Sequence, residues 1–535
     1  MTREEIVVGL DIGTTKVCTV IGQGNASTGA PGEETGPINV IGVGVVPSRG
    51  IKKGVVVDVE ETVAAIRDSV ERAAHMAGVQ VEGAVAGVTG DHILSSNRRG
   101  TVTVASPQGS ISRFDVERVL QAASLEIPRD REIIHSLPRD FIVDGHPGVK
   151  RPIGMAGQRL EVETHVVTGK ASFLQNVVQC VERAGLHVEA LVLEPIATAE
   201  AVTTPDERDM GVILIDIGGG TSDIAVFIDG SIIYSSVLPV GGNHVTRDIA
   251  IGLRTPFEIA ERLKIDRGAA TQELIPHGEA LEVLMAGSGE RLRIPRALLG
   301  EIIEARMSEL FELSREAMHA AGVTRRLPGG VILSGGGALL PGAVDLSSEI
   351  FQMPVRLGFP IGLSGWSDQV ANPQFATGVG LCRFALQQRY APGNQAAIPA
   401  IASTEGRRIW GAIAASSLPF QAPETTKTPS DAAEEEAMGH ETETSVQDAP
   451  ATTNGAVSNA NGNTNGVETT PFDGRSLPAP SNGEVIPPLA KRGEFRDDLF
   501  RREELGTAPA QNSVPLSLWA KFWAKVREII GFEST

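Results

Sequence analysis

The pattern of apolar and polar positions changes once along the chain, near residue 390. Before that point, short β-branched runs that predict buried strands alternate with stretches whose apolar residues recur at helical spacing. This alternation is typical of α/β proteins. The clearest predicted elements are a helix at 55–78 preceded by a strand, a strand at 81–90, a helix and then a strand within 173–195 with Gly185 as the C-cap, and a long helix at 297–322.

The alternation is lost at 395–512. Thr, Pro, Asp and Glu dominate there, followed by the Asn/Gly tract ATTNGAVSNANGNTNG at 451–466. Such a composition cannot bury enough apolar surface to fold alone, so we predict a disordered linker. An apolar island, GRRIWGAIAA at 406–415, interrupts it. For this island both a second membrane-touching patch and a docked turn remain open.

Helical periodicity returns in the terminal segment SVPLSLWAKFWAKVREIIGFEST at 513–535. On a helix, one side gathers the apolar residues Leu516, Leu518, Trp519, Phe522, Trp523, Val526, Ile529 and Ile530. Trp on one face with flanking Lys and Arg is the composition of a helix that lies in the headgroup plane of a membrane. The alternative is a terminal helix docked on the protein's own core. The long tether favours the membrane, and the predicted contacts are Trp519, Phe522, Trp523, Val526, Ile530, Lys521 and Lys525.

Composition narrows the function classes. The 535 residues suffice for two or more domains, and the formal net charge of -19 disfavours nucleic-acid binding through bulk charge. Cys18, Cys180 and Cys382 show no metal-ligand spacing and are interpreted as ordinary thiols in a reducing compartment. The charged N-terminus argues against a signal peptide, and no apolar run is long enough to span a bilayer. We therefore expect a cytoplasmic protein.

One glycine-bearing turn between two apolar runs occurs twice. The first copy is IVVGLDIGTTKVCTVIG at 6–22, and the second is VILIDIGGGTSDIAVF at 212–227. Glycines let the backbone approach a ligand closely, so that N–H groups and Thr hydroxyls can cradle phosphate oxygens. The candidate phosphate-binding residues are Gly13, Thr14, Thr15, Lys16, Gly218, Gly219, Gly220 and Thr221.

The strand before each turn ends in an acidic residue, Asp11 in the first copy and Asp216 in the second. These carboxylates could hold a magnesium ion through its waters, because magnesium dehydrates reluctantly. Lys16 adds a positive charge for the phosphates. A single copy could be an ordinary glycine-bearing hairpin, but two copies, each with its Asp, favour a phosphate site.

A third glycine-rich turn lies in GGVILSGGGALLPG at 329–342, where a strand is followed by Ser334, Gly335, Gly336 and Gly337 and then by an apolar helix start. It is neither a GxGxxG nor a Walker loop. Such a turn lets the backbone lie flat against a purine, with the helix N-terminus facing phosphate. Taken alone it could equally serve close packing of a helix on a strand.

In this order the three motifs resemble the nucleotide-binding superfamily of actin, Hsp70 and the sugar kinases. The resemblance implies two lobes that close on ATP, with two phosphate hairpins and an adenosine loop. In that superfamily a Glu–Lys pair often flanks the ribose and base, and EIAERLKID at 258–266 supplies Glu261 and Lys264. Without the superfamily these two residues would be an ordinary i, i+3 surface pair.

Several further segments resemble the bacterial cell-division family FtsA. They are GVTGDHILSSNRRGTVTV, DVERVLQAASLEIPRDREIIHSLPRDFIVDG, LEVETHVVTGK, LEPIATAEAV and PVGGNHVTRDIAIGLRTPFEIAERLKI. The resemblance covers about 4–392 and resumes at the C-terminal helix, although the tether is much longer than usual for the family. It implies a first-lobe core at 1–88 and 167–195, an inserted small domain at 89–166, a second lobe at 196–394 that returns to the first lobe at its end, the linker at 395–512 and a membrane-targeting helix at 513–535.

The family resemblance implies that the protein polymerises with ATP and links the tubulin-like protein FtsZ to the cytoplasmic face of the membrane at the division site. Glu194 resembles the position where actin-like ATPases orient the attacking water, although a Glu-Pro at a strand end could also be a lobe hinge. We expect at most slow ATPase activity. A pilus scaffold like PilM and a small-molecule kinase are the alternatives, but neither has a use for this tail. Arg306 is a candidate donor to an acidic FtsZ peptide, or else a solvated side chain loosely paired with Glu309.

Overall fold

The computed structural model describes residues 5–24, 37–106, 108–124, 127–287, 289–323 and 326–390. The predicted linker at 395–512 and the predicted membrane helix at 513–535 lie outside these residues. No helix in the described ranges is both long and apolar enough to cross a membrane.

A six-stranded mixed sheet is built around the N-terminal strands, in the order β11-β6-β1-β2-β3-β19. Its strands are β1 (Glu5–Ile12), β2 (Lys16–Gly24), β3 (Ile38–Pro47), β6 (Gly83–Val88), β11 (His187–Leu193) and β19 (Leu363–Gly365). Alternation along β2 sends Thr19 to one face, where its side chain contacts Ser69 of α1 (Val59–Ala77). Val20 points to the other face, close to Gly378 of α11 (Ala376–Tyr390). Helices therefore cover both faces, which explains why β1 and β2 are almost continuously buried.

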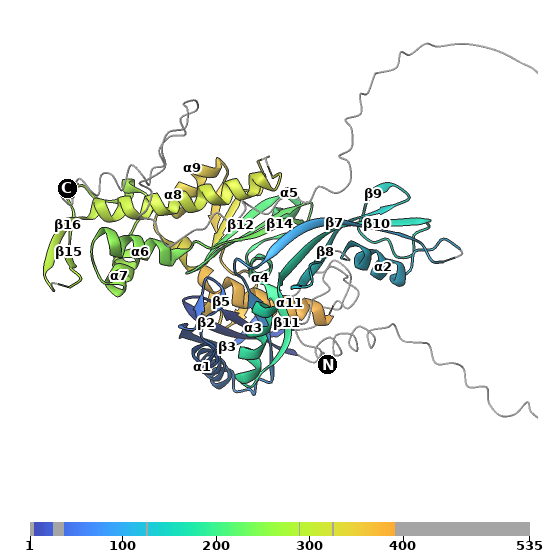
Figure 1. Ribbon diagram of the computed structural model, residues 1–535, viewed down its shortest axis with the longest axis horizontal. Coiled ribbons are helices and arrows are strands. Elements are labelled where there is room, and N and C mark those ends of the chain that lie inside the picture. Colours follow the sequence, from blue (N-terminus) through green and yellow to red (C-terminus); the bar gives the residue numbers. More distant parts are fainter. Residues whose placement is uncertain are drawn as a thin grey trace, which may run out of the picture. The chain divides into compact units, whose positions relative to one another are not determined.

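A five-stranded sheet forms the second core, in the order β14-β13-β12-β17-β18. Its strands are β12 (Val212–Ile217), β13 (Ser222–Ile228), β14 (Ser231–Leu238), β17 (Val331–Ser334) and β18 (Val355–Leu357). Ile213 and Ile215 join a core with the helices α6 (Gly242–Gly252), α7 (Phe257–Arg267), α8 (Arg296–Ala320) and α9 (Ala343–Phe351). Figure 1 shows the long α8 beside α6 and α9. Leu214 points the opposite way, into the core of the first sheet.

A third sheet lies in the segment that leaves the first sheet after β6 and returns to it at β11. Its strands β7 (Leu94–Thr103), β10 (Arg159–Lys170), β8 (Arg131–Val143) and β9 (His146–Val149) pair in this order and are all antiparallel. The helix α2 (Arg113–Ala123) packs on this sheet over its own small apolar core (Figure 1). Ser112 begins α2 with a capping box to Asp115. The inserted segment therefore has a core of its own.

Short helices and hairpins complete the described chain. The helices are α3 (Ala171–Arg183), α4 (Glu194–Val202), α5 (Pro205–Met210) and α10 (Ser367–Val370), with 3-10 turns η1 (Gln272–Leu274), η2 (Gly336–Leu339) and η3 (Pro373–Phe375). The hairpins pair β4 (Ile51–Lys52) with β5 (Val55–Val56) and β15 (Ala280–Leu284) with β16 (Arg291–Pro295). The helix α4 leads from β11 toward the second sheet, and β19 with α11 brings the chain back to the first.

The predicted elements are confirmed, with small corrections at their ends. The helix predicted at 55–78 is α1, which begins after the N-cap Asp58 and ends at Gly78 in the left-handed region. Gly185 is not the C-cap of α3, because Ala184 takes that place and Gly185 follows it at a φ of 95°. The helix start predicted after Gly337 is the 3-10 turn η2, and the α-helix α9 begins only at Ala343.

Candidate nucleotide-binding site

The two repeated motifs form the same turn. In the first copy the N–H of Gly13 donates to the carbonyl of Lys16 over 3.0 Å, and in the second the N–H of Gly218 donates to the carbonyl of Thr221 over 2.9 Å. Each turn joins two antiparallel strands, β1 with β2 and β12 with β13. The sequence repeat therefore corresponds to a structural repeat, with one copy in each of the two large sheets.

The two turns face each other at very short range. A Cβ added to Gly219 would lie 1.9 Å from Oγ1 of Thr15, and one added to Gly220 would lie 2.6 Å from Oγ1 of Thr14. Any side chain at these two positions would therefore collide with the opposite turn. The N–H of Gly54 also donates to Oγ1 of Thr14 over 3.3 Å. The Thr hydroxyls of one turn thus lie against the bare backbone of the other, which is the kind of surface that can enclose phosphate oxygens.

The third glycine loop lies against the end of β12. Strand β17 pairs parallel with β12, which places Ser334 opposite Asp216. Gly335 has a φ of 79°, and a Cβ there would lie 2.4 Å from Oδ1 of Asp216. A Cβ on Gly337 would lie 2.4 Å from Cγ2 of Ile217, whereas one on Gly336 would meet nothing within 4 Å. The backbone at Gly336 is therefore open to a ligand, as the adenosine-loop prediction requires.

Between the turns lie Asp11, Glu194, Asp216 and Asp223, all buried. Nζ of Lys16 is 3.0 Å from Oδ2 of Asp11. Burial alone would lower the pKa of Lys16, but the charge and hydrogen bond of Asp11 together with the charges of Cys18 and Asp216 outweigh it and raise this pKa above its ordinary value. The site therefore gathers more buried negative charge than Lys16 can balance, which favours the entry of a cation.

Thr hydroxyls stabilise two of these carboxylates. Thr198 and Thr377 donate to Oδ2 of Asp216 over 2.7 and 3.2 Å. Burial, and after it the charge of Asp11, nevertheless raise the pKa of Asp216 to about 6. Asp223 accepts from Thr89 and Thr221, yet burial and the charge of Asp216 raise its pKa to about 7.

Glu194, the first residue of α4, has the least satisfied carboxyl group of the four. It is 9% exposed, and its Oε1 makes no hydrogen bond within the described residues. Burial, together with Asp11 and Asp223, raises the pKa of Glu194 well above its ordinary value. Gly87 of β6 makes room for it, since a Cβ there would lie 3.2 Å from Cγ of Glu194. A buried, unpaired carboxyl oxygen among other acids is suited to a water or a metal-bound water.

The predicted Glu261–Lys264 pair is joined to the second turn through α6. Nζ of Lys264 lies 2.7 Å from Oε2 of Glu261 and donates to the carbonyl of Gly242 over 3.2 Å. The N–H groups of Gly242 and Asn243 in turn donate to the carbonyls of Gly218 and Gly219 over 2.9 and 2.8 Å. Lys264 is buried, so the pair is not the ordinary surface pair that remained open above.

The acidic residues fit a magnesium ion better than a transition metal. The described residues contain no cluster of three or more His, Cys, Asp or Glu that could hold a metal. Magnesium typically binds through one or two carboxylates plus substrate phosphates and waters. Asp11 and Asp216, which both interact electrostatically with Lys16, are such a pair. The residues present therefore fit the predicted magnesium–nucleotide group.

Sequence models and curated relatives agree on one family. The model described as "Cell division protein FtsA" matches residues 213–380, and that described as "SHS2 domain inserted in FTSA" matches residues 90–168. A third model, "Ethanolamine utilisation protein EutA", matches residues 161–261. The Cell division protein FtsA of Pseudomonas aeruginosa is 42% identical over 72% of this chain and 90% of its own, and that of Escherichia coli K12 is 34% identical over 72% and 91%. The chain belongs to the FtsA family.

One solved structure shares the fold of this chain. The structure titled "PilM-PilN type IV pilus biogenesis complex" aligns with 71% of this chain and 98% of its own, with a TM-score of 0.51 and 17% identity. At that identity the likeness concerns the fold alone. The predicted actin-like α/β fold with an inserted domain is therefore confirmed. Apart from the last two residues of β10, the inserted sheet with its core lies within the range of the SHS2 model.

Arg306 is not placed as its predicted role in binding FtsZ assumed. Its Nε lies 2.5 Å from Oδ2 of Asp248, it also pairs with Glu309, and its side chain is only 11% exposed. It is therefore neither a solvated arginine nor an uncommitted donor. A carboxylate from a partner would first have to displace Asp248, so the geometry weighs against the predicted role.

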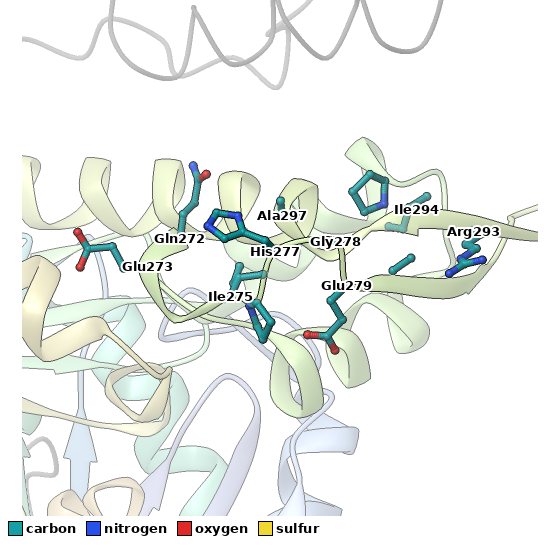
Figure 2. A pocket seen from close by; sticks show the side chains of 12 residues that line it. Gln272, Glu273, Ile275, His277, Gly278, Glu279, Arg293, Ile294 and Ala297 are labelled. Carbon is teal, nitrogen blue, oxygen red and sulfur yellow. The ribbon is translucent and has the colours of Figure 1, made fainter.

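A groove of about 690 Å³ lies elsewhere on the second lobe, and Figure 2 shows the residues that line it. It is bounded by η1, the hairpin β15–β16 and the first turn of α8, with His277, Glu279 and Arg293 among its lining residues. None of the predicted site residues lines it. The groove therefore takes no part in the nucleotide site.

Sequence reasoning missed four residues of the site. They are Thr89, Thr198, Thr377 and Asp223, which bond one another or the predicted carboxylates. Asp223 carried a local signal, because it is the last residue of the second repeated motif, DIGGGTSD. The three threonines come from three distant segments and carry no local signal.

Proposed function

We propose that this FtsA-family chain binds ATP with magnesium between its two glycine turns, polymerises in that state, and attaches FtsZ to the cytoplasmic face of the membrane. The observation that supports nucleotide binding best is the pair of facing turns, where Gly219 and Gly220 leave room for no side chain beside Thr15 and Thr14. Family membership supports the role in cell division.

In this proposal the chain's own residues divide the work. The N–H groups of the two turns and the hydroxyls of Thr14, Thr15 and Thr221 bind phosphate oxygens, and Lys16 neutralises part of their charge. Asp11 and Asp216 hold the waters of the magnesium ion, which when bound supplies positive charge to the phosphates. The backbone of the third loop lies against the adenine, while the Glu261–Lys264 pair flanks the ribose.

Hydrolysis in this site should be slow. Glu194 is the residue we propose to orient the attacking water, because its buried Oε1 is unpaired. Its raised pKa favours the neutral carboxyl, which can hold a water by hydrogen bonds but is a poor base. We therefore propose that ATP acts mainly as a ligand that favours one conformation and the polymer formed from it.

The membrane part of the proposal rests on the terminal segment. Insertion at the headgroup boundary would remove apolar area from water at Trp519, Phe522, Trp523, Val526 and Ile530. This burial would stabilise binding by up to about 1.5–3 kcal/mol for each large side chain if it were fully buried. Partial burial and ordering of the helix reduce this figure greatly. Lys521, Lys525 and Arg527 would add roughly 1 kcal/mol each near an anionic leaflet before salt screening.

Such weak anchoring explains why polymerisation belongs to the proposal. One tail binds reversibly, and the acidic body is repelled by the same leaflet. Many tails held in one polymer bind through avidity, which can exceed single-site affinity by about 10²–10⁴. A pilus scaffold or a small-molecule kinase is not proposed, since the curated relatives are cell-division proteins and the PilM likeness concerns the fold alone.

The proposal is tested by recruitment of purified FtsZ to anionic vesicles. With the full chain and ATP present, FtsZ should sediment with the vesicles, because one chain would contact both. Without the chain, or with a chain lacking 513–535, FtsZ should stay in the supernatant. FtsZ that sediments equally well with the truncated chain would contradict the adaptor function.

A further inference from the structure

The inserted sheet is joined covalently to the first lobe but hydrogen bonded to the second. At its root, between β6 and β7, the hydroxyl of Thr89 donates to Oδ1 of Asp223 on β13. Both residues are almost fully buried. Because Thr89 precedes the insertion and Asp223 belongs to the second sheet, this hydrogen bond connects the two lobes at the point where the insertion begins.

A second set of hydrogen bonds lies along the edge strand β14. Oγ of Ser95 donates to the carbonyl of Ser235 over 2.6 Å, and Nδ2 of Asn97 donates to the carbonyl of Ile233 over 2.9 Å. These carbonyls belong to the edge of the second sheet, which would otherwise present unpaired backbone groups. Polar side chains of the inserted domain therefore bond backbone carbonyls of that edge.

His165 of β10 completes this contact. Its Nδ1 lies 2.8 Å from Oδ1 of Asn97 and its Nε2 lies 2.9 Å from Oγ of Ser235. Burial lowers the pKa of His165 to about 3, so the ring is neutral and both its nitrogens find partners. A buried histidine whose two ring nitrogens are both hydrogen bonded favours one specific arrangement of the elements it joins.

Asp223 links these contacts to the second glycine turn. Its Oδ2 accepts from the hydroxyl of Thr221 over 3.2 Å, while its Oδ1 accepts from Thr89. On the neighbouring strand it pairs with Val237, two residues from Ser235. The carboxylate of Asp223 thus contacts the predicted phosphate turn and the root of the insertion, while its backbone pairs with β14, the strand along which the insertion lies.

We propose that Asp223 is a positioning residue that couples the nucleotide site to the inserted domain through Thr89. This inference rests on the proposed nucleotide binding. A bound nucleotide would bridge the two turns, and the Thr89–Asp223 hydrogen bond joins the same two lobes. Both therefore favour the same arrangement of the lobes. Each therefore strengthens the other, and linkage requires the effect to be equal in both directions.

The test compares Thr89→Val, which removes the hydroxyl, with Thr89→Ser, which keeps it. ATP affinity is measured by titration for the full-length parent and each variant. Hydrogen exchange of the β7 amides at 94–103 is measured for each of them without ATP and with saturating ATP. In the parent, ATP should slow exchange in β7. In Thr89→Val, ATP should bind at least about fivefold more weakly and should no longer slow this exchange. Thr89→Ser should behave like the parent.

Two controls keep the outcome decisive. Thr101→Val changes an exposed threonine of β7 and should leave both measurements unchanged. Asp223→Asn tests the same link from the other lobe and should also abolish the ATP-dependent protection. If Thr89→Val and Asp223→Asn bind ATP and protect β7 as the parent does, the coupling is refuted. If the parent itself binds no ATP, the proposed function fails, and this inference fails with it.

Discussion

The substitution Gly219→Ala should separate the two glycine turns and weaken ATP binding. The new Cβ would lie 1.9 Å from Oγ1 of Thr15, about 1.5 Å inside the 3.4 Å at which ordinary contact begins, and 3.1 Å from Cβ of Thr15. Rotation of Thr15 can move Oγ1 away but not its Cβ, so one turn must still shift by a few tenths of an ångström. A misplacement of about 1 Å can cost roughly 100-fold in a positioned site, so this smaller shift should cost less than that. Overpacking should also lower the free energy of unfolding by about 1–3 kcal/mol.

The matched control is Gly218→Ala in the same turn. Its Cβ would come no closer than 3.2 Å to another atom, the carbonyl oxygen of Thr221, so the shift required is a few tenths of an ångström. Because this contact lies within its own turn, whereas that of Gly219 is with the opposite turn, equilibrium titration with ATP and magnesium should give a smaller loss of affinity for Gly218→Ala than for Gly219→Ala. Equal ATP affinity of the parent and Gly219→Ala, with unchanged melting temperatures, would refute the placement of the phosphates between the turns.

Three further perturbations follow from the same contacts. Asp216→Ala removes the magnesium-ordering carboxylate, and Gly336→Arg fills the open backbone of the third loop; either should abolish saturable ATP binding while the circular dichroism spectrum stays that of the parent. Burial raises the pKa values of Asp216 and Asp223 to about 6 and 7. Between the ordinary pKa of an aspartate, about 4, and these values, the folded protein holds protons that the unfolded chain has already released. These two groups should therefore make the free energy of unfolding fall as the pH rises from about 4 to 7. Urea unfolding should therefore show a smaller loss between pH 5 and pH 7 for Asp223→Asn than for the parent, and an equal loss would contradict the assigned burial. Arg306→Glu should lower the free energy of unfolding by roughly 3–5 kcal/mol, since it leaves Asp248 unpaired beside a new carboxylate. If this variant stays folded and still pulls down FtsZ, Arg306 is excluded from the FtsZ site.

Much of the candidate nucleotide site could be predicted because its backbone requirements are local. The second turn lies so close to the first that a Cβ on Gly219 would be 1.9 Å from Oγ1 of Thr15, so this position needs glycine. The glycines are visible in the motif itself. Asp11 and Asp216 are also visible locally, because each precedes the last residue of the strand that leads into its turn. The repeated spacing of these residues, rather than any single motif, made the prediction specific.

The rest of the site depends on distant segments that fold against one another. Thr198 and Thr377 are separated by 179 positions, yet both reach Asp216. Nothing in the local sequence of either residue distinguishes it from a helix threonine that bonds its own backbone. The partner of Arg306 could not be predicted for a related reason: its spacing on α8 shows which face of the helix it lies on, but not that Asp248 of α6 lies opposite.

The central claim, an ATP-dependent polymer held on the membrane by its tails, is tested most directly by co-sedimentation with anionic vesicles. The full chain, a chain lacking 513–535 and the double variant Trp519→Glu with Trp523→Glu are each compared with and without ATP. The full chain should sediment with vesicles, and more strongly with ATP, because polymerisation adds avidity. The truncated chain and the double variant should stay in the supernatant while binding ATP normally. Vesicle binding that survives the double variant, or that does not depend on ATP, would contradict the account.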